Sequence, residues 1–299
     1  MLTNALPFGI LYSRVKQGSK RKKLKKKFKK TLDNVLNIVY NKDIVKERKQ
    51  IKMEMKIDRR KSYYILLDTE TCNTRTVDGK LDTSDVLVYD ICWAVVDKMG
   101  NVYKTGAYLV DEIFNDEQTL METAYYAKKI PEYLEQIAKG ERVVKKWYEI
   151  RRQLVADMEM FDTNILIAHN ARFDYNALNT TTRWLSKSKY RTFVKGEWWD
   201  TLKMARQTIT KQSMYKHFCE ENGFLTATGR VKTTAEVLYR YITFDLTFVE
   251  EHKGLEDVMI EKEIFSKCMA QHKAMEKKLF SKPFTTPYKD PFAWVKTIY

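Results

Sequence analysis

The segment that most constrains the fold is an apolar run that ends in two acids, Tyr63-Tyr64-Ile65-Leu66-Leu67-Asp68-Thr69-Glu70-Thr71. Consecutive aromatic and aliphatic residues are typical of a short strand that is buried on both faces. Side chains alternate along a strand, so we expect Asp68 and Glu70 on the same side. Two carboxylates this close repel each other unless a cation lies between them, and oxygen ligands suit Mg²⁺ or Mn²⁺. The run therefore predicts a central strand that carries part of a divalent-cation site.

The positive charge of the chain is concentrated near its N-terminus. The net charge of the 299 residues is +15, but residues 1–61 hold 20 Lys and Arg against 5 Asp and Glu, while the remainder is balanced at 34 against 34. This asymmetry is typical of a basic arm attached to a balanced domain, and such arms bind nucleic acid or an anionic membrane surface. Apolar residues spaced by three and four from Leu24 to Val39 predict an amphipathic helix in the arm. Its narrow apolar face, which lacks Trp, favours nucleic acid over a membrane.

Nine basic side chains between residues 20 and 30 are the predicted nucleic-acid contacts of this arm. A solvated tail or a localisation signal is the alternative interpretation. The nine residues are Lys20, Arg21, Lys22, Lys23, Lys25, Lys26, Lys27, Lys29 and Lys30.

The cysteine content and the hydropathy of the chain indicate the cellular compartment in which the protein is expected. Four scattered cysteines with no short paired spacing argue against a disulfide framework or a zinc site, and so indicate a reducing environment. No stretch reaches the 18 or more apolar residues typical of a membrane helix. We expect the cytoplasm, with the nucleus as the alternative.

The order of the predicted elements indicates an α/β domain. Apolar runs predict a hairpin at residues 86–97 and 102–110, beside the first strand, and a further strand at 164–168. Residues 198–206 begin as a strand or turn and continue as a helix. Helical spacing predicts helices at 114–129, 144–161, 175–185, 213–221, 233–241 and 254–272.

Two further acids and a histidine stand at the junctions of these elements. Asp174 follows the strand at 164–168, and Asp257 lies near the start of the last long helix, five residues after His252. Each acid alone has an ordinary explanation, because a carboxylate near a helix N-terminus is favoured by the helix dipole. The combination with Asp68 and Glu70 is harder to explain in that way.

Three motifs in this order resemble those of the DEDD-type 3′→5′ exonucleases of the DnaQ-like superfamily. The first is the apolar strand ending in Asp68-Thr69-Glu70, and the second is His169-Asn170-Ala171-Arg172-Phe173-Asp174. The third, His252-Lys253-Gly254-Leu255-Glu256-Asp257, is similar to that of the His subclass. The resemblance covers roughly residues 62–275. The chain departs from many relatives at Cys72-Asn73, which replaces Thr-Gly in the loop beneath the substrate terminus.

The resemblance implies a role for each matching residue. Asp68, Glu70, Asp174 and Asp257 would bind two Mg²⁺ or Mn²⁺ ions and so take part in catalysis, and His252 would be the general base. Thr69, Thr71, Asn170 and Phe173 would contact the substrate, with the Phe173 ring stacking on a base of a frayed single strand. His169 is expected to shape the second motif.

The fold implied is an RNase H-like α/β domain, with a mixed five-stranded sheet flanked by helices and preceded by the basic helical arm. We expect three regions: the arm at 1–61, the exonuclease domain at 62–275, and an extension at 276–299 packed on the domain. The expected activity is metal-dependent release of nucleoside 5′-monophosphates from a 3′ end, with DNA favoured, in phage or bacterial replication, proofreading or repair. A polymerase or another replication protein is a possible partner. An RNA-trimming enzyme and a non-catalytic nucleic-acid-binding or packaging protein with the same fold are the alternatives.

Overall fold

The computed structural model describes residues 57–77, 80–124, 126–140, 142–189 and 191–280. The predicted basic contacts at residues 20–30 and most of the extension at 276–299 lie outside these ranges. No helix among the described residues is both long and apolar enough to cross a bilayer.

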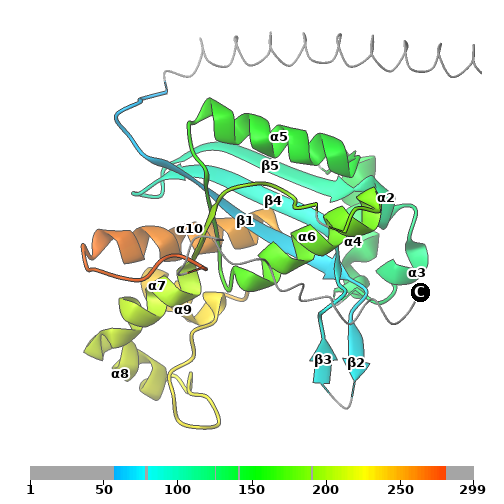
Figure 1. Cartoon of the computed structure of the whole chain (residues 1–299). Coiled ribbons are helices and arrows are strands. Elements are labelled where there is room, and N and C mark those ends of the chain that lie inside the picture. The colour runs from blue at the N-terminus through cyan, green and yellow to red at the C-terminus, as the bar shows by residue number, and fades with distance from the viewer. Residues whose placement is uncertain (1–56, 78–79, 125, 141, 190, 281–299) are drawn as a thin grey trace, which may run out of the picture. The chain divides into compact units, whose positions relative to one another are not determined.

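A six-stranded mixed sheet forms the centre of the described domain (Figure 1). Its order is β6-β5-β4-β1-β7-β8. β1 pairs with β4 and β4 with β5 in antiparallel fashion, whereas β1–β7, β7–β8 and β5–β6 are parallel pairs. The strands are β1 Tyr63–Cys72, β4 Leu87–Asp97, β5 Val102–Val110, β6 Val143–Lys145, β7 Ile165–Ala168 and β8 Glu197–Asp200; a separate small hairpin contains β2 Arg75–Val77 and β3 Lys80–Asp82.

The predicted fold class is confirmed, with one correction to the sheet. The mixed sheet flanked by helices is the α/β architecture expected, and β1 lies between β4 and β7 as the apolar run predicted. The sheet has six strands rather than five, because β6 extends it beside β5. Val143 and Val144 are β-branched residues that favour a strand, and the helix predicted from residue 144 begins only at Trp147.

Helices cover both faces of the sheet. On one face, Leu66 of β1 and Ile167 of β7 belong to a buried apolar cluster with residues of α7 to α10. On the other face, the Trp93 indole donates a hydrogen bond to Asp157 of α5 at 2.9 Å. The helices are α2 Asp111–Phe114, α3 Gln118–Met121, α4 Ile130–Ala138, α5 Trp147–Met160, α6 Arg172–Ser186, α7 Thr201–Gln207, α8 Ser213–Glu221, α9 Ala235–Thr243 and α10 Leu255–Ala270, with 3₁₀ turns η1 Ala127–Lys129 and η2 Ile209–Lys211.

The helix predicted at 114–129 is wrong. This segment forms the end of α2, the short α3 and the turn η1. The Asn115 side chain donates to Asp111 at 2.6 Å, and the Thr123 hydroxyl donates to the Leu120 carbonyl at 2.6 Å. Such local side-chain hydrogen bonds compete with continuous helix, so the segment breaks into turns.

The first residues of the predicted C-terminal extension lie along β8. The Asp200 N–H donates to the Lys277 carbonyl at 2.8 Å, and the Leu279 N–H donates to the Trp198 carbonyl at 2.7 Å. The Leu279 side chain is buried. This part of the extension therefore covers the outer edge of β8.

Candidate metal centre

The central strand β1 carries the first two predicted acids. Glu70 is buried and lies opposite Asp90 of β4 in the antiparallel register. Like charges directly opposite on neighbouring strands are unfavourable. Asp90, however, has its own partners: Arg142 Nη1 lies 2.9 Å from both of its carboxylate oxygens, and the Tyr133 hydroxyl donates to it at 3.1 Å. Arg142 and Tyr133 are thus engaged by Asp90, and Glu70 forms no ion pair among the described residues.

Asp174 reaches the end of β1 from the first turn of α6. The helix starts directly after β7, and its N-terminal dipole favours a carboxylate there. The Thr69 hydroxyl, between the two acids of β1, donates to Asp174 at 2.8 Å. The second motif is thereby held against the first.

A loop with two residues in the left-handed region sets the third motif in place. His252 has φ +52° and Gly254 has φ +49°. A Cβ atom at position 254 would lie 2.7 Å from the Cys92 sulfur of β4, so a glycine is required for this close approach. The loop leads directly into α10, whose first turn carries Asp257.

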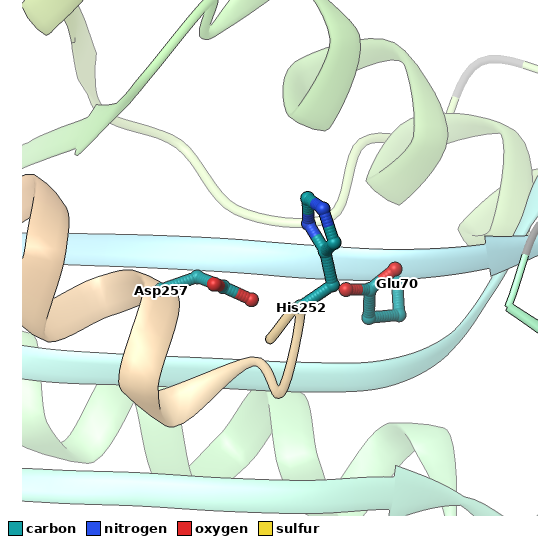
Figure 2. A group of neighbouring side chains, drawn as sticks. All are labelled: Glu70, His252 and Asp257. Atoms are coloured by element: carbon teal, nitrogen blue, oxygen red, sulfur yellow. The ribbon is translucent and has the colours of Figure 1, made fainter. Parts of the chain in front are cut away.

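Glu70, His252 and Asp257 meet at one point. One ligand atom from each residue lies within 4.8 Å of the other two. Figure 2 shows the carboxylates of Glu70 and Asp257 directed toward one another, with the His252 imidazole rising from the loop beside them. Asp68 and Asp174 are not part of this compact group. Asp68 instead lines a cavity of about 530 Å³ together with Asp257.

The acids raise one another's pKa because they are buried together. Burial, followed by the charges of Asp174 and Glu70, holds the pKa of Asp68 well above its usual range. Burial and the charge of Asp257 raise the pKa of Glu70 to about 9. Burial is also the largest cause of the raised values of Asp174, about 7, and of Asp257, about 6. All four predicted acids therefore form one electrostatic cluster.

The donor set fits a divalent cation. Both carboxylate oxygens of Asp257 are buried and form no hydrogen bond of ordinary geometry with the described residues, although the Gly254 backbone N–H lies close enough to lower the pKa of this carboxylate. Buried charges in proteins are normally paired or coordinate a metal, and several carboxylate oxygens are the ligands that Mg²⁺ and Mn²⁺ prefer. The positive charge of Lys129 lowers the pKa of Glu70 and that of Asp257, but Lys129 forms no ion pair with either carboxylate among the described contacts.

His252 is held by groups from the segment before α4. Its imidazole stacks on the Tyr126 ring, with 4.5 Å between the ring centroids, and the Lys129 ammonium donates to its carbonyl at 3.1 Å. Partial burial, and then the charge of Lys129, lower the pKa of His252. The ring is therefore neutral near pH 7, as a proton acceptor must be.

The remaining predicted residues differ in position. Asn170 lines the cavity, and Phe173 is half-buried at the start of α6. Thr69 and Thr71 are buried and do not line the cavity. Both ring nitrogens of His169 have partners, Thr201 Oγ1 at 3.0 Å and the Thr233 carbonyl at 3.1 Å, which agrees with a shaping role.

The sequence analysis missed several groups at the site. Glu250 and Glu261 line the cavity, Asp90 and Arg142 lie behind Glu70, and Tyr126 stacks on His252. Glu261 follows Asp257 by four residues, and that helical spacing was a usable signal. Asp90 and Arg142 depend on strand register, Tyr126 lies in a segment that was wrongly predicted as one helix, and Glu250 lies in the loop before α10.

The carboxylate cluster makes the stability of the metal-free protein depend on pH. Between pH 7 and 8.5 the folded chain keeps a proton on Glu70, whose pKa is raised to about 9, whereas the unfolded chain has released it near pH 4. The folded state then binds more protons, so the free energy of unfolding falls as pH rises. We expect the melting temperature in EDTA to fall across this window, and Mn²⁺ to restore more stability at pH 8.5 than at pH 7.

Glu70→Gln is the matched test of this prediction. At pH 8 it should stabilise the metal-free protein by about 1 kcal/mol or more, which corresponds to about 2–4 °C in a domain of this size. It should also flatten the pH dependence and reduce the gain from Mn²⁺. A wild-type melting temperature that stays constant from pH 7 to 8.5 would contradict the prediction.

The fold and the site together define an α/β domain with a buried acidic centre at the end of its central strand. No family description and no curated protein sequence matches the chain. Among solved structures, it is similar to the nuclease domain of 3′hExo, a DEDDh family member bound to rAMP, with 13% identity, a TM-score of 0.47, and coverage of 74% of this chain and 100% of that one.

Two further structures are similar at comparable distance. S. pombe Pop2p in its Mg²⁺- and Mn²⁺-bound form has 12% identity and a TM-score of 0.41, with coverage of 77% of this chain and 91% of that one. E. coli Exonuclease I in complex with a dA16 oligonucleotide has 11% identity and a TM-score of 0.39. That match covers 70% of this chain but only 41% of the Exonuclease I chain.

Proposed function

We propose that the chain is a divalent-metal-dependent 3′→5′ exonuclease that releases nucleoside 5′-monophosphates, with DNA as the favoured substrate. The observation that carries the proposal is the convergence of Glu70, His252 and Asp257, from β1, the 252–254 loop and α10, within 4.8 Å. The unpartnered buried oxygens of Asp257 support a cation there. Replication, proofreading or repair is the proposed setting, and a polymerase partner finds no support in the similar structures.

The residues of the site have distinct parts in this proposal. Asp68, Glu70, Asp174 and Asp257 would hold two Mg²⁺ or Mn²⁺ ions. Bound there, the ions would supply positive charge for the attacking and leaving oxygens of an in-line phosphoryl displacement. His252, kept neutral by partial burial and by Lys129, would accept the proton of the attacking water.

Neighbouring groups would orient the substrate and the base. Asn170 lines the cavity beside the acids, and the half-buried Phe173 directly precedes Asp174 in the chain, so both are proposed to contact the terminal nucleotide. The stacking of Tyr126 on the His252 ring limits the directions that the imidazole can take. Thr69 holds Asp174 through its hydroxyl, which is a positioning role in addition to any substrate contact.

The activity test uses the purified full chain with 3′-labelled and 5′-labelled oligonucleotides of DNA and of RNA. With Mn²⁺ or Mg²⁺ we expect single nucleotides from the 3′ end and none in EDTA. Faster cleavage of RNA than of DNA would favour the alternative of an RNA-trimming enzyme. Binding without cleavage in either metal would favour the non-catalytic alternative.

The basic arm is proposed to contribute affinity without sequence preference. Removal of residues 1–56, which keeps Lys61 and its hydrogen bond to Tyr103 at 2.6 Å, should weaken binding and leave the chemistry intact. Each phosphate neutralised contributes about −0.7 to the slope of log affinity against log salt on single strands. We therefore expect a steep slope for the full chain and a shallow one for the truncated chain.

The measurement is a fluorescence titration of an oligonucleotide at several salt concentrations. Both chains carry Asp174→Ala, and EDTA is present, so that no cleavage occurs. A control chain replaces only the nine basic residues between 20 and 30 by Gln. Identical slopes for all three chains would show that the arm does not touch nucleic acid, and its apolar stripe would then be assigned to a protein partner.

A further inference from the structure

Glu261 is a buried acid next to the proposed metal centre that none of the motifs contains. It lies in α10 four residues after Asp257, so both side chains project from the same side of the helix. Glu261 is only 4% exposed. One of its oxygens, Oε1, accepts a hydrogen bond from the His169 backbone N–H at 2.8 Å, at the end of β7.

The other oxygen of Glu261 has no partner. Oε2 is buried and forms no hydrogen bond with the described residues. No Lys, Arg or His among the described residues forms an ion pair with this carboxylate. A protonated Oε2 would equally lack an acceptor, so neither protonation state is satisfied by the surrounding protein.

The unpartnered carboxylate shares a cavity with the proposed ligands. The cavity of about 530 Å³ is lined by Glu261, Asp68 and Asp257, and by Arg206 among other residues. Arg206 forms no ion pair with a carboxylate among the described residues, and its guanidinium donates to the Thr233 hydroxyl at 3.5 Å. A cation in this cavity would complete the coordination that the protein leaves open.

We propose that Glu261 is a fifth carboxylate of the metal centre, which ligates a divalent cation directly or through one water molecule. This inference rests on the proposed function, because it places Glu261 at the same cation as Asp257. Glu261 also connects the metal centre to a second element, because its carboxylate accepts a hydrogen bond from the His169 backbone N–H and so links α10 to the end of β7. The four-carboxylate set implied by the motifs is thereby extended.

The test measures Mn²⁺ binding to the full chain by calorimetry and by the electron paramagnetic resonance signal of free Mn²⁺. Glu261→Gln keeps the length of the side chain and an oxygen that can accept from His169, but removes the charge. We expect Mn²⁺ affinity to fall by about 10–100-fold, the range found when a group that supports a metal site is removed. Glu256→Gln, an exposed position on the same helix, removes an equal charge and should change affinity by less than about twofold.

Each outcome separates this inference from the proposed function. If Glu261→Gln bound Mn²⁺ like the wild type while Asp257→Asn did not, Glu261 would be a buried structural acid and only this inference would fall. If the wild type itself bound no Mn²⁺, the proposed function would fall and this inference with it. An equal loss in Glu256→Gln would also overturn the inference, because the effect would then be one of overall charge.

Glu261→Asp covers the case in which Glu261→Gln does not fold. The substitution keeps the negative charge but shortens the side chain by one methylene, which moves the carboxylate away from the cation. We therefore expect Mn²⁺ affinity to fall by about three- to tenfold. Circular dichroism and the melting temperature in EDTA establish that each variant is folded. Wild-type affinity in a folded Glu261→Asp chain, with Glu261→Gln unfolded, would overturn the inference.

Discussion

Asp257→Asn should lower the rate of nucleotide release from a 3′ end by at least about 10³-fold, because a metal ion supplies several kcal/mol of charge stabilisation to the transition state. Asp257 is buried and neither of its oxygens forms a hydrogen bond of ordinary geometry within the described part of the chain, so an asparagine fits the space while it removes the charge. Single-turnover cleavage of an end-labelled oligonucleotide at saturating Mn²⁺ measures the loss. Asp68→Asn, Glu70→Gln and Asp174→Asn should behave in the same way.

Asp162→Asn is the matched control for this series. Asp162 is exposed, lies before β7 and thus at the other end of that strand from Asp174, and has φ +49°, a conformation that asparagine tolerates well. It should keep the wild-type rate. Near-normal activity of Asp174→Asn with Mg²⁺ would show that the four-carboxylate assignment is wrong.

His252→Asn should slow cleavage by about 10²–10⁴-fold and leave Mn²⁺ affinity unchanged, which is the usual effect of removing a positioned general base. Asparagine is chosen because residue 252 has φ +52°, where alanine would add backbone strain. The loss of rate should therefore reflect the removal of the imidazole and not a change in the backbone of the loop. A fall in Mn²⁺ affinity as large as that of Asp257→Asn would instead make His252 a metal ligand, which its distance from Glu70 and Asp257 permits.

The pH dependence of the rate gives a second readout of His252. Because partial burial and the charge of Lys129 lower the pKa of the His252 imidazole, the rate should fall only when the pH drops through this lowered pKa and the ring becomes protonated. Lys129→Met should move this acid limb to higher pH, since it removes a positive charge next to the ring. Lys128→Met, at the exposed neighbouring position, should leave the limb in place.

Local sequence patterns predicted the core of the fold and the four acids. The apolar run of β1, the strand β7 and the helix α6 are short-range features, and each motif lies at the end of such an element. Helix α8 was predicted with its observed bounds, because Ser213 and the apolar spacing that follows it are local signals. The structure brings Glu70 and Asp257 close together, whereas their role as metal ligands, which the family resemblance implied, stays a prediction.

The features that were missed depend on contacts between distant segments. The position of Asp90 opposite Glu70 is a consequence of strand register, and the pairing of Asp90 with Arg142 joins residues 52 positions apart. The strand β6 forms by pairing in parallel with the edge of β5, and this tertiary interaction overrides the helical spacing of the residues in β6. Tyr126 reaches His252 only because residues 114–129 fold as turns rather than as one helix.

The pairing of residues 277–279 with β8 bears on where this protein can be shortened. An unpaired sheet edge exposes a row of N–H and C=O groups to which another chain can add, and such edges promote aggregation. Here the Lys277 carbonyl and the Leu279 N–H occupy part of that edge. A boundary drawn at residue 275 would leave β8 as a bare template for self-association, so the structural unit is better ended after Leu279.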